Sequence, residues 1–194
     1  MTAIGFQTIP TNEIKINEYE LAQRLNTEKG FKSDLIDKNL NRLLEVVNCK
    51  FSFSRVPVKR LGGNRLDFGF GEFESEVLLK NLKECQEAFI FAVTLGIGVD
   101  RLLNKLAVIS TTDYFVTDAL ASALAEAAAG ETEKRIKGDI VCRPRFSPGF
   151  GDLTLEVQPR LIRSIDAQKL LGVTVGKTYL MSPMKTVTAI IGIV

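Results

Sequence analysis

The chain has 194 residues, which is long enough for one domain with a sizeable hydrophobic core. Its 25 basic and 23 acidic residues leave a net charge of +2, which indicates neither a nucleic-acid-binding nor a membrane-surface protein. It contains no histidine, and this excludes Ser-His-Asp catalysis, histidine acid–base catalysis and most zinc or iron sites.

Cysteine usage and the start of the chain point to a reducing compartment. Cys49, Cys85 and Cys142 lie far apart and form no CxxC pair, so we expect small buried apolar residues and no metal or thiol site. The first ten residues lack a basic segment followed by an apolar run, and no apolar stretch approaches the length of a membrane span. We therefore expect a cytoplasmic protein.

The first fifty residues predict one short strand and two helices. Residues 13–16 could form the strand, and a helical pattern then runs from about Asn17 until Gly30 interrupts it. Ser33 is a good N-cap for a second helix over residues 34–47.

A hairpin is expected next. Residues 50–61 alternate in polarity as a half-exposed strand does, and the Gly-Gly-Asn turn at residues 62–64 leads to a return strand over residues 65–70. Pro57 has no N–H to donate, which would confine the first strand to an edge of its sheet.

The most strand-like run is EAFIFAVTL, residues 87–95, which we expect to be buried on both faces. A short helix is expected before it at residues 75–82, and Gly96-Ile97-Gly98 should turn it into a helix over residues 99–108. A strand, glycines and a helix in this order are typical of dinucleotide sites. The third glycine of GxGxxG is missing, however, so a phosphate site here is the minor alternative.

A long alanine-rich helix should follow over residues 113–137, capped by Thr111 or Thr112. Glu126 is conspicuous in its apolar centre. It is either a solvent-facing glutamate or a carboxylate that faces a site, and the residue type favours the solvent-facing interpretation.

Residues 143–152, RPRFSPGFGD, cannot form a regular helix or a central strand because they hold two prolines and two glycines. They form either a rigid binding loop, rich in arginine and aromatic groups, or a connector between two helices. Composition alone favours the connector, and Asp152 is expected to cap the following helix.

The rest of the chain predicts a helix over residues 155–171, with Pro159 in its first turn and Gly172 at its end. Residues 173–181 and 185–194 then suggest two strands. Helices and strands are interspersed, with hairpins and few clear parallel crossovers, which favours an α+β fold with a largely antiparallel, twisted sheet.

Four pieces of the last third occur in an informative order. They are the alanine-rich helix with Leu124-Ala125-Glu126, the Arg-x-x-Pro-Gly-aromatic loop at residues 145–150, the next helix, and the Met-x-Pro-x-x-Thr-Val-Thr tail at residues 181–188. In these pieces the chain resembles the activation (reactivation) domain of cobalamin-dependent methionine synthase. Residues 86–194 match clearly and residues 1–85 weakly, and we treat residues 1–194 as a single unit.

The resemblance implies a function in methionine biosynthesis. Domains of this family present S-adenosylmethionine to a cobalamin that has been oxidised, and an electron from a flavodoxin-like donor permits its remethylation. The implied fold is α+β with a twisted antiparallel sheet, flanked by helices. The chain would be a component of methyltransferase activity in trans, with no catalytic residue or metal site of its own. Its partner would be a methionine synthase that lacks this domain and supplies the cobalamin.

The resemblance also implies the ligand-binding residues. Arg145 matches the arginine that binds the ligand carboxylate, and Glu126 matches a glutamate at the ligand. Gly149 would let the loop backbone approach and donate its amide, and Ser147 belongs to the same expected set. Phe150 stands where the family has a tyrosine, so it keeps the ring and loses a hydroxyl.

Three departures from the family keep an alternative open: the Phe150 substitution, the end of the chain at Val194 before further aromatic ligand contacts, and the lack of a clear early ligand-binding aspartate. The alternative is a docking or scaffold protein for a corrinoid enzyme that binds no ligand. An unrelated small-molecule-binding α+β domain is a third possibility. A basic cluster could steer an acidic electron donor, or could simply be a solvated face: Lys134, Arg135, Lys137 and Arg143.

Overall fold

A computed structural model describes residues 3–28, 30 and 33–194. Its main sheet has four strands, each antiparallel to its neighbours, in the order β1 (Ile4–Thr8), β2 (Lys50–Pro57), β6 (Glu87–Thr94) and β9 (Thr186–Ile193). A second sheet joins β3 (Lys59–Gly62), β4 (Arg65–Asp67) and β5 (Glu72–Glu74), and a third pairs β7 (Thr174–Val175) with β8 (Met181–Ser182). The predicted α+β class with an antiparallel sheet is confirmed.

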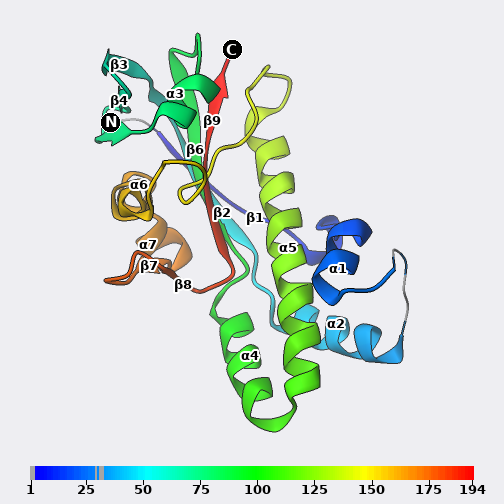
Figure 1. Ribbon diagram of the computed structural model, residues 1–194. Coiled ribbons are helices and arrows are strands. Elements are labelled where there is room, and N and C mark those ends of the chain that lie inside the picture. The colour runs from blue at the N-terminus through cyan, green and yellow to red at the C-terminus, as the bar shows by residue number, and fades with distance from the viewer. Residues whose placement is uncertain (1–2, 29, 31–32) are drawn as a thin grey trace.

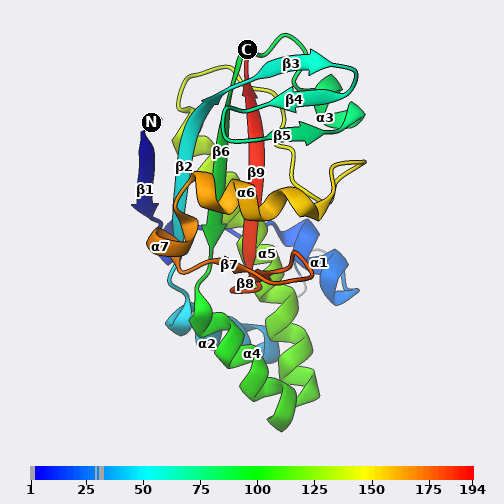
Figure 2. The same ribbon diagram turned by 90° about the vertical axis from the view of Figure 1, so that its left-hand side faces the viewer.

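Helices cover both faces of the main sheet (Figures 1 and 2). One face carries α1 (Glu18–Leu25), α2 (Asp34–Val46) and the long α5 (Thr111–Lys137). The other carries α3 (Glu76–Asn81), α6 (Gln158–Ser164) and α7 (Ala167–Leu171), together with the β3–β5 sheet. α4 (Ile97–Ile109) forms a hairpin with α5 that extends beyond the end of the main sheet. No helix in the described ranges is long and apolar enough to cross a membrane.

Two hydrophobic cores meet at the central strand β6. Successive side chains of a strand point to opposite faces, so Phe89 and Phe91 pack beneath α5 while Ala88 and Ile90 pack toward α6 and α7. The expectation that this run is buried on both faces is confirmed. The small side chains of α5 that face the sheet, such as Ala121, let the helix backbone approach closely.

The expected edge position of Pro57 is wrong. β2 lies between β1 and β6, but β1 pairs with it only as far as Ser54. Pro57 therefore ends β2 beyond the reach of β1, where its missing N–H leaves no gap in that ladder. The single strand predicted over residues 50–61 is divided after Val58, because its second half turns into β3 of another sheet.

Several predicted boundaries also differ. Residues 13–16 form no strand, since a 3₁₀ turn (Thr11–Glu13) precedes α1. The predicted strand over residues 173–181 is reduced to β7 and β8, because Tyr179 lies in the left-handed region and closes a turn. The caps at Ser33 and Gly172 are confirmed. For α5 the N-cap is Ser110, whose hydroxyl accepts from the Asp113 N–H, and neither threonine serves.

The helix predicted over residues 155–171 is three pieces: a 3₁₀ turn (Leu155–Val157), α6 and α7. The break between α6 and α7 falls at Asp166, whose φ of 50° is left-handed and stops the helical hydrogen bonding. Pro159 lies in the first turn of α6, as expected.

Candidate functional site

The loop at residues 143–152 is more than a connector, because its first half pairs with the outer edge of β9. The Phe146 N–H donates to the Ile190 carbonyl at 2.9 Å, and the Ile190 N–H donates back at 2.8 Å. The Arg143 N–H donates to the Gly192 carbonyl at 2.8 Å. After Phe146 the loop leaves β9 and crosses to α6 (yellow in Figure 1).

Asp152 fixes the far end of this loop, and its expected role is wrong. Its carboxylate accepts from the hydroxyl of Ser75 and from the N–H groups of Glu76, at 2.7 Å, and Val77, at 3.3 Å. It therefore caps α3 and not the helix that follows it. The hydrogen bond from Ser75, followed by those from the backbone, holds the pKa of Asp152 below its usual range.

Gly149 allows the tight turn in the middle of the loop, with a φ of 92° in the left-handed region. Its N–H donates to the carbonyl of Leu153 at 2.7 Å. In this conformation the amide that we expect to donate to a ligand is therefore engaged within the loop, and its donation to a ligand stays a prediction. Gly149 shapes the loop from within.

Glu126 and Arg145 face each other across the space between α5 and the loop. The Nη2 of Arg145 lies 2.7 Å from the Oε2 of Glu126. The Nη1 of Arg145 is buried and has no hydrogen-bond partner in the described part of the chain. Glu126 is half-buried and faces the loop, so the solvent-facing interpretation does not describe its surroundings. The pair presents one carboxylate and one unsatisfied guanidinium nitrogen.

A pocket with a volume of about 410 Å³ lies beside this pair, along the first residues of β9. Its lining residues with polar side-chain groups are Glu126, Ser147, Gln158, Tyr179, Thr186 and Thr188. Its apolar lining includes Pro148, Phe150, Leu155, Leu180, Met181 and Met184. The structure thus brings the helix, the loop and the tail of the chain to one hollow. Among the predicted residues, Glu126, Ser147 and Phe150 line it, Arg145 adjoins it through Glu126, and Gly149 does not line it.

Lys185 holds the start of β9 in place next to the pocket. Its Nζ lies 2.7 Å from the Oδ1 of Asp118 and 2.8 Å from the Oγ of Ser122, and its side chain is largely buried. Ser122 precedes Glu126 by one turn of α5, so this contact fixes the distance between that face of α5 and the strand.

Sequence reasoning missed Gln158, which is 3% exposed, and its partner Thr188. A glutamine beside Pro159 at the start of a helix resembles an ordinary surface residue. The available signal is weak: Gln158 directly follows Val157, the buried last residue of the 3₁₀ turn, and precedes the buried face of α6.

The basic cluster is largely neutralised within the described chain. Arg135 pairs with Glu131 at 2.9 Å and with Glu13, while Lys137 pairs with Glu133 at 3.2 Å. Arg143 lies 3.7 Å from Glu84. Lys134 is exposed and appears in no ion pair formed by described residues. Steering of an acidic electron donor by this cluster stays a prediction. The positive electrostatic field of the cluster is weaker than the sequence suggests, because these ion pairs neutralise most of its charge.

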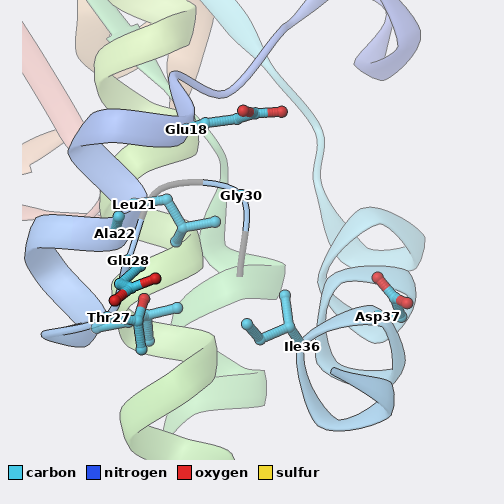
Figure 3. A pocket seen from close by; sticks show the side chains of 9 residues that line it. Glu18, Leu21, Ala22, Thr27, Glu28, Gly30, Ile36 and Asp37 are labelled. Carbon is cyan, nitrogen blue, oxygen red and sulfur yellow. The ribbon is translucent and has the colours of Figure 1, made fainter. Parts of the chain in front are cut away.

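Two other places in the molecule, the hollow between α1 and α2 and the start of α4, do not contain the predicted ligand-binding residues. The hollow between α1 and α2 has a volume of about 140 Å³, below the range of sites for drug-sized ligands, and is lined by residues such as Leu21 and Ile36 (Figure 3). In the first turn of α4, a Cβ on Gly98 would lie 2.5 Å from the carbonyl oxygen of Val46. Close approach to α2 therefore accounts for this glycine without a phosphate.

No protein-family model and no curated protein matches the sequence. The structure is similar to a crystal structure of the MetH reactivation domain bound to AdoHcy, with a TM-score of 0.75 over 98% of this chain and 78% of that chain. The chain has the fold of a MetH reactivation domain. The resemblance noted in the sequence is thereby confirmed as a structural resemblance. At 14% identity the similarity establishes the fold, and function has to be argued from the site.

Proposed function

We propose that the chain is a stand-alone reactivation domain that binds S-adenosylmethionine and supports reductive remethylation of the cobalamin of a partner methionine synthase. One observation carries the proposal. The pocket on β9 joins Glu126, the proline-glycine loop and the threonine tail, in a fold whose solved neighbour has AdoHcy bound. The partner would be a methionine synthase without a reactivation domain of its own, with a flavodoxin-like protein as electron donor.

The charged end of the pocket suits the amino-acid end of S-adenosylmethionine. A guanidinium binds a carboxylate through two parallel hydrogen bonds, and the buried Nη1 of Arg145 has no partner among the described residues. Glu126, which only accepts hydrogen bonds, can take the ligand ammonium. The ion pair between them keeps both groups in place before the ligand arrives.

The remainder of the pocket suits the nucleoside. Its volume of about 410 Å³ falls within the usual range for small-molecule sites, and most of its lining is apolar. The ring of Phe150 is exposed at the rim and packs edge-on against Phe146, with ring centroids 6.4 Å apart. Phe150 can therefore cover a bound ring system without supplying a hydrogen bond.

The partner's cobalamin would supply a nucleophilic cobalt, to which the ligand sulfonium gives its methyl group. The residues of this chain would contribute position and charge, with no side-chain acid or base. Arg145 and Glu126 would hold the amino-acid end and the apolar lining the nucleoside, so that the methyl group is presented to the partner.

Calorimetric titration of the isolated protein with S-adenosylmethionine and with S-adenosylhomocysteine tests the proposal. Saturable heat and a rise in melting temperature are expected. The docking protein that binds no ligand is the second candidate, because Glu126 already occupies one nitrogen of Arg145 and Phe150 lacks the hydroxyl of the family tyrosine. It predicts neither heat nor a thermal shift, and that result would overturn our proposal in its favour.

A further inference from the structure

The edge of β9 is covered along its second half and open along its first. Ile190 directs its N–H and carbonyl toward the loop, and every second residue of a strand shares that direction. Thr188 therefore points its N–H and carbonyl the same way. If the pairing of Phe146 with Ile190 continued along the strand, Pro148 would lie opposite Thr188, but a proline has no N–H to donate. The loop has also left β9 before this position. Both backbone groups of Thr188 lack a partner in the chain as described, and Thr188 lines the pocket.

The side chain of Thr188 orients a second polar group in the same place. Its hydroxyl donates to the Oε1 of Gln158 at 2.8 Å, and the two residues are 2% and 3% exposed. Gln158 lines the pocket, and its Nε2 has no hydrogen-bond partner in the described ranges. That nitrogen is not among the unpartnered polar atoms that are sealed away from solvent, so it keeps access to solvent on a residue that lines the pocket. An amide that is held at its oxygen and has no protein partner at its nitrogen offers an oriented donor to a ligand.

The surroundings of this amide specify the chemistry of the missing partner. The charged groups, Glu126 and Arg145, belong to α5 and to the loop, whereas Gln158 lies on α6 on the other face of β9. Apart from Glu126 the lining of the pocket carries no charged side chain, and much of it is apolar, as with Leu155 and Met181. A flat, uncharged ring with apolar faces and a rim of donors and acceptors satisfies this end of the pocket. Adenine is such a ring.

We infer that Gln158 and the open backbone of Thr188 form the nucleobase-recognising end of the pocket. The Nε2 of Gln158 donates to N1 of adenine, and the carbonyl of Thr188 accepts from the exocyclic amino group. This inference rests on the proposed function, because it assigns the second half of the same ligand. Gln158 is then a ligand-binding residue, and the hydroxyl of Thr188 is a positioning group.

The experiment crosses two variants with two ligands. Binding of S-adenosylhomocysteine and of adenosine is measured by calorimetry or ligand-observed NMR for the parent chain, Gln158→Leu and Arg145→Ala. Gln158→Leu is expected to weaken both ligands by a similar factor of about ten, since a buried donor is lost. Arg145→Ala is expected to weaken S-adenosylhomocysteine and to leave adenosine unchanged, because adenosine has no carboxylate.

A ligand change provides a readout that does not depend on the folding of a variant. S-inosylhomocysteine carries a proton on N1 and a carbonyl in place of the amino group, so the donor and the acceptor on that edge of the ring are reversed, while N3 and N7 stay acceptors. The parent chain is expected to bind it about tenfold more weakly than S-adenosylhomocysteine, because each donor and acceptor of the site then meets its like.

The outcomes separate the two proposals. Binding of S-adenosylhomocysteine that depends on Arg145 but changes less than twofold in Gln158→Leu, or with S-inosylhomocysteine, overturns the nucleobase assignment alone. An effect of Gln158→Leu on S-adenosylhomocysteine but not on adenosine also overturns it, because it places Gln158 at the other end. Failure of the parent chain to bind S-adenosylhomocysteine overturns the proposed function itself.

Discussion

Replacing Arg145 by alanine removes the guanidinium that pairs with Glu126 beside the pocket. In the free protein its Nη2 donates to Glu126 at 2.7 Å, and its buried Nη1 has no partner within residues 3–28, 30 and 33–194. A ligand carboxylate would satisfy Nη1 and could share Nη2. The substitution therefore removes one or two charge-assisted hydrogen bonds from the complex and leaves Glu126 as an unpaired negative charge beside the ligand carboxylate.

Each hydrogen bond to a charged group is worth about 1.5 to 3 kcal/mol, and about 1.4 kcal/mol corresponds to a factor of ten in Kd. We expect Arg145→Ala to cost about 3 kcal/mol of binding free energy, or roughly a hundredfold in Kd. Arg145→Lys keeps the charge but loses the planar fork, and it should cost roughly tenfold. The free energy of unfolding should change by at most about 1 kcal/mol, because both partners of the ion pair are partly exposed.

Isothermal titration of S-adenosylhomocysteine into each variant measures these factors. Arg143→Ala is the matched control, since Arg143 belongs to the same loop but contacts the carbonyl of Lys83 and the carboxylate of Glu84 outside the pocket. Its Kd should stay within about twofold of the parent value. The site assignment would be refuted if Arg145→Ala bound as tightly as the parent, or if both alanine variants weakened binding equally.

Three further predictions concern the loop and the helices. Phe150→Tyr places a hydroxyl at the pocket rim and should tighten ligand binding about fivefold, as expected for one neutral hydrogen bond of about 1 kcal/mol. An unchanged Kd in the same titration would show that no ligand group reaches this hydroxyl. Asp152→Ala should lower the melting temperature at pH 7, and the difference from the parent chain should shrink below about pH 4. The folded-state pKa of Asp152 is depressed, so the carboxylate stabilises the fold above its usual pKa, and this stabilisation is lost as acid protonates it. A difference in melting temperature that persists at pH 2 would contradict this. Gly98→Ala should destabilise the fold by about 1 to 3 kcal/mol, because the new Cβ would lie 2.5 Å from the carbonyl oxygen of Val46. Gly130→Ala, in open space on α5, should stabilise it by roughly 1 kcal/mol; equal shifts of both variants in urea unfolding would rule out the steric argument.

The sequence predicts best those elements whose own residue types indicate that they are buried. Residues 87–95 are apolar at every position from Ala88 to Val93, so β6 could only be a strand covered on both faces. The alanine-rich stretch likewise specifies α5 through its helix propensity. In both cases local preference and tertiary packing favour the same structure.

The features that could not be predicted depend on partners far away in the chain. Asp152 caps α3 because the fold brings Ser75 to it, although 77 positions separate the two residues. Pro57 is tolerated in an inner strand only because β1 ends before it, which no local pattern records. Gln158 looks like a surface residue until Thr188 is seen to hold its amide.

The candidate site could be predicted from the sequence in part. The order of Glu126, the loop and the tail indicates that these pieces belong together, and the structure gives them a common pocket. The sequence could not show that Gly149 uses its own N–H within the loop, or that half of the edge of β9 is left open.

Methyl transfer to a partner tests the central claim most directly. A methionine synthase truncated before its reactivation domain, with its cobalamin in the oxidised, inactive form, is incubated with a chemical reductant and methyl-labelled S-adenosylmethionine, with and without this protein. We expect label to appear on the cobalamin, and methionine synthesis to resume, only when the protein is present, and the rate to fall with Arg145→Ala but not with Arg143→Ala. Transfer at the same rate without the protein, or no transfer in its presence although the cobalamin is reduced, would contradict the account.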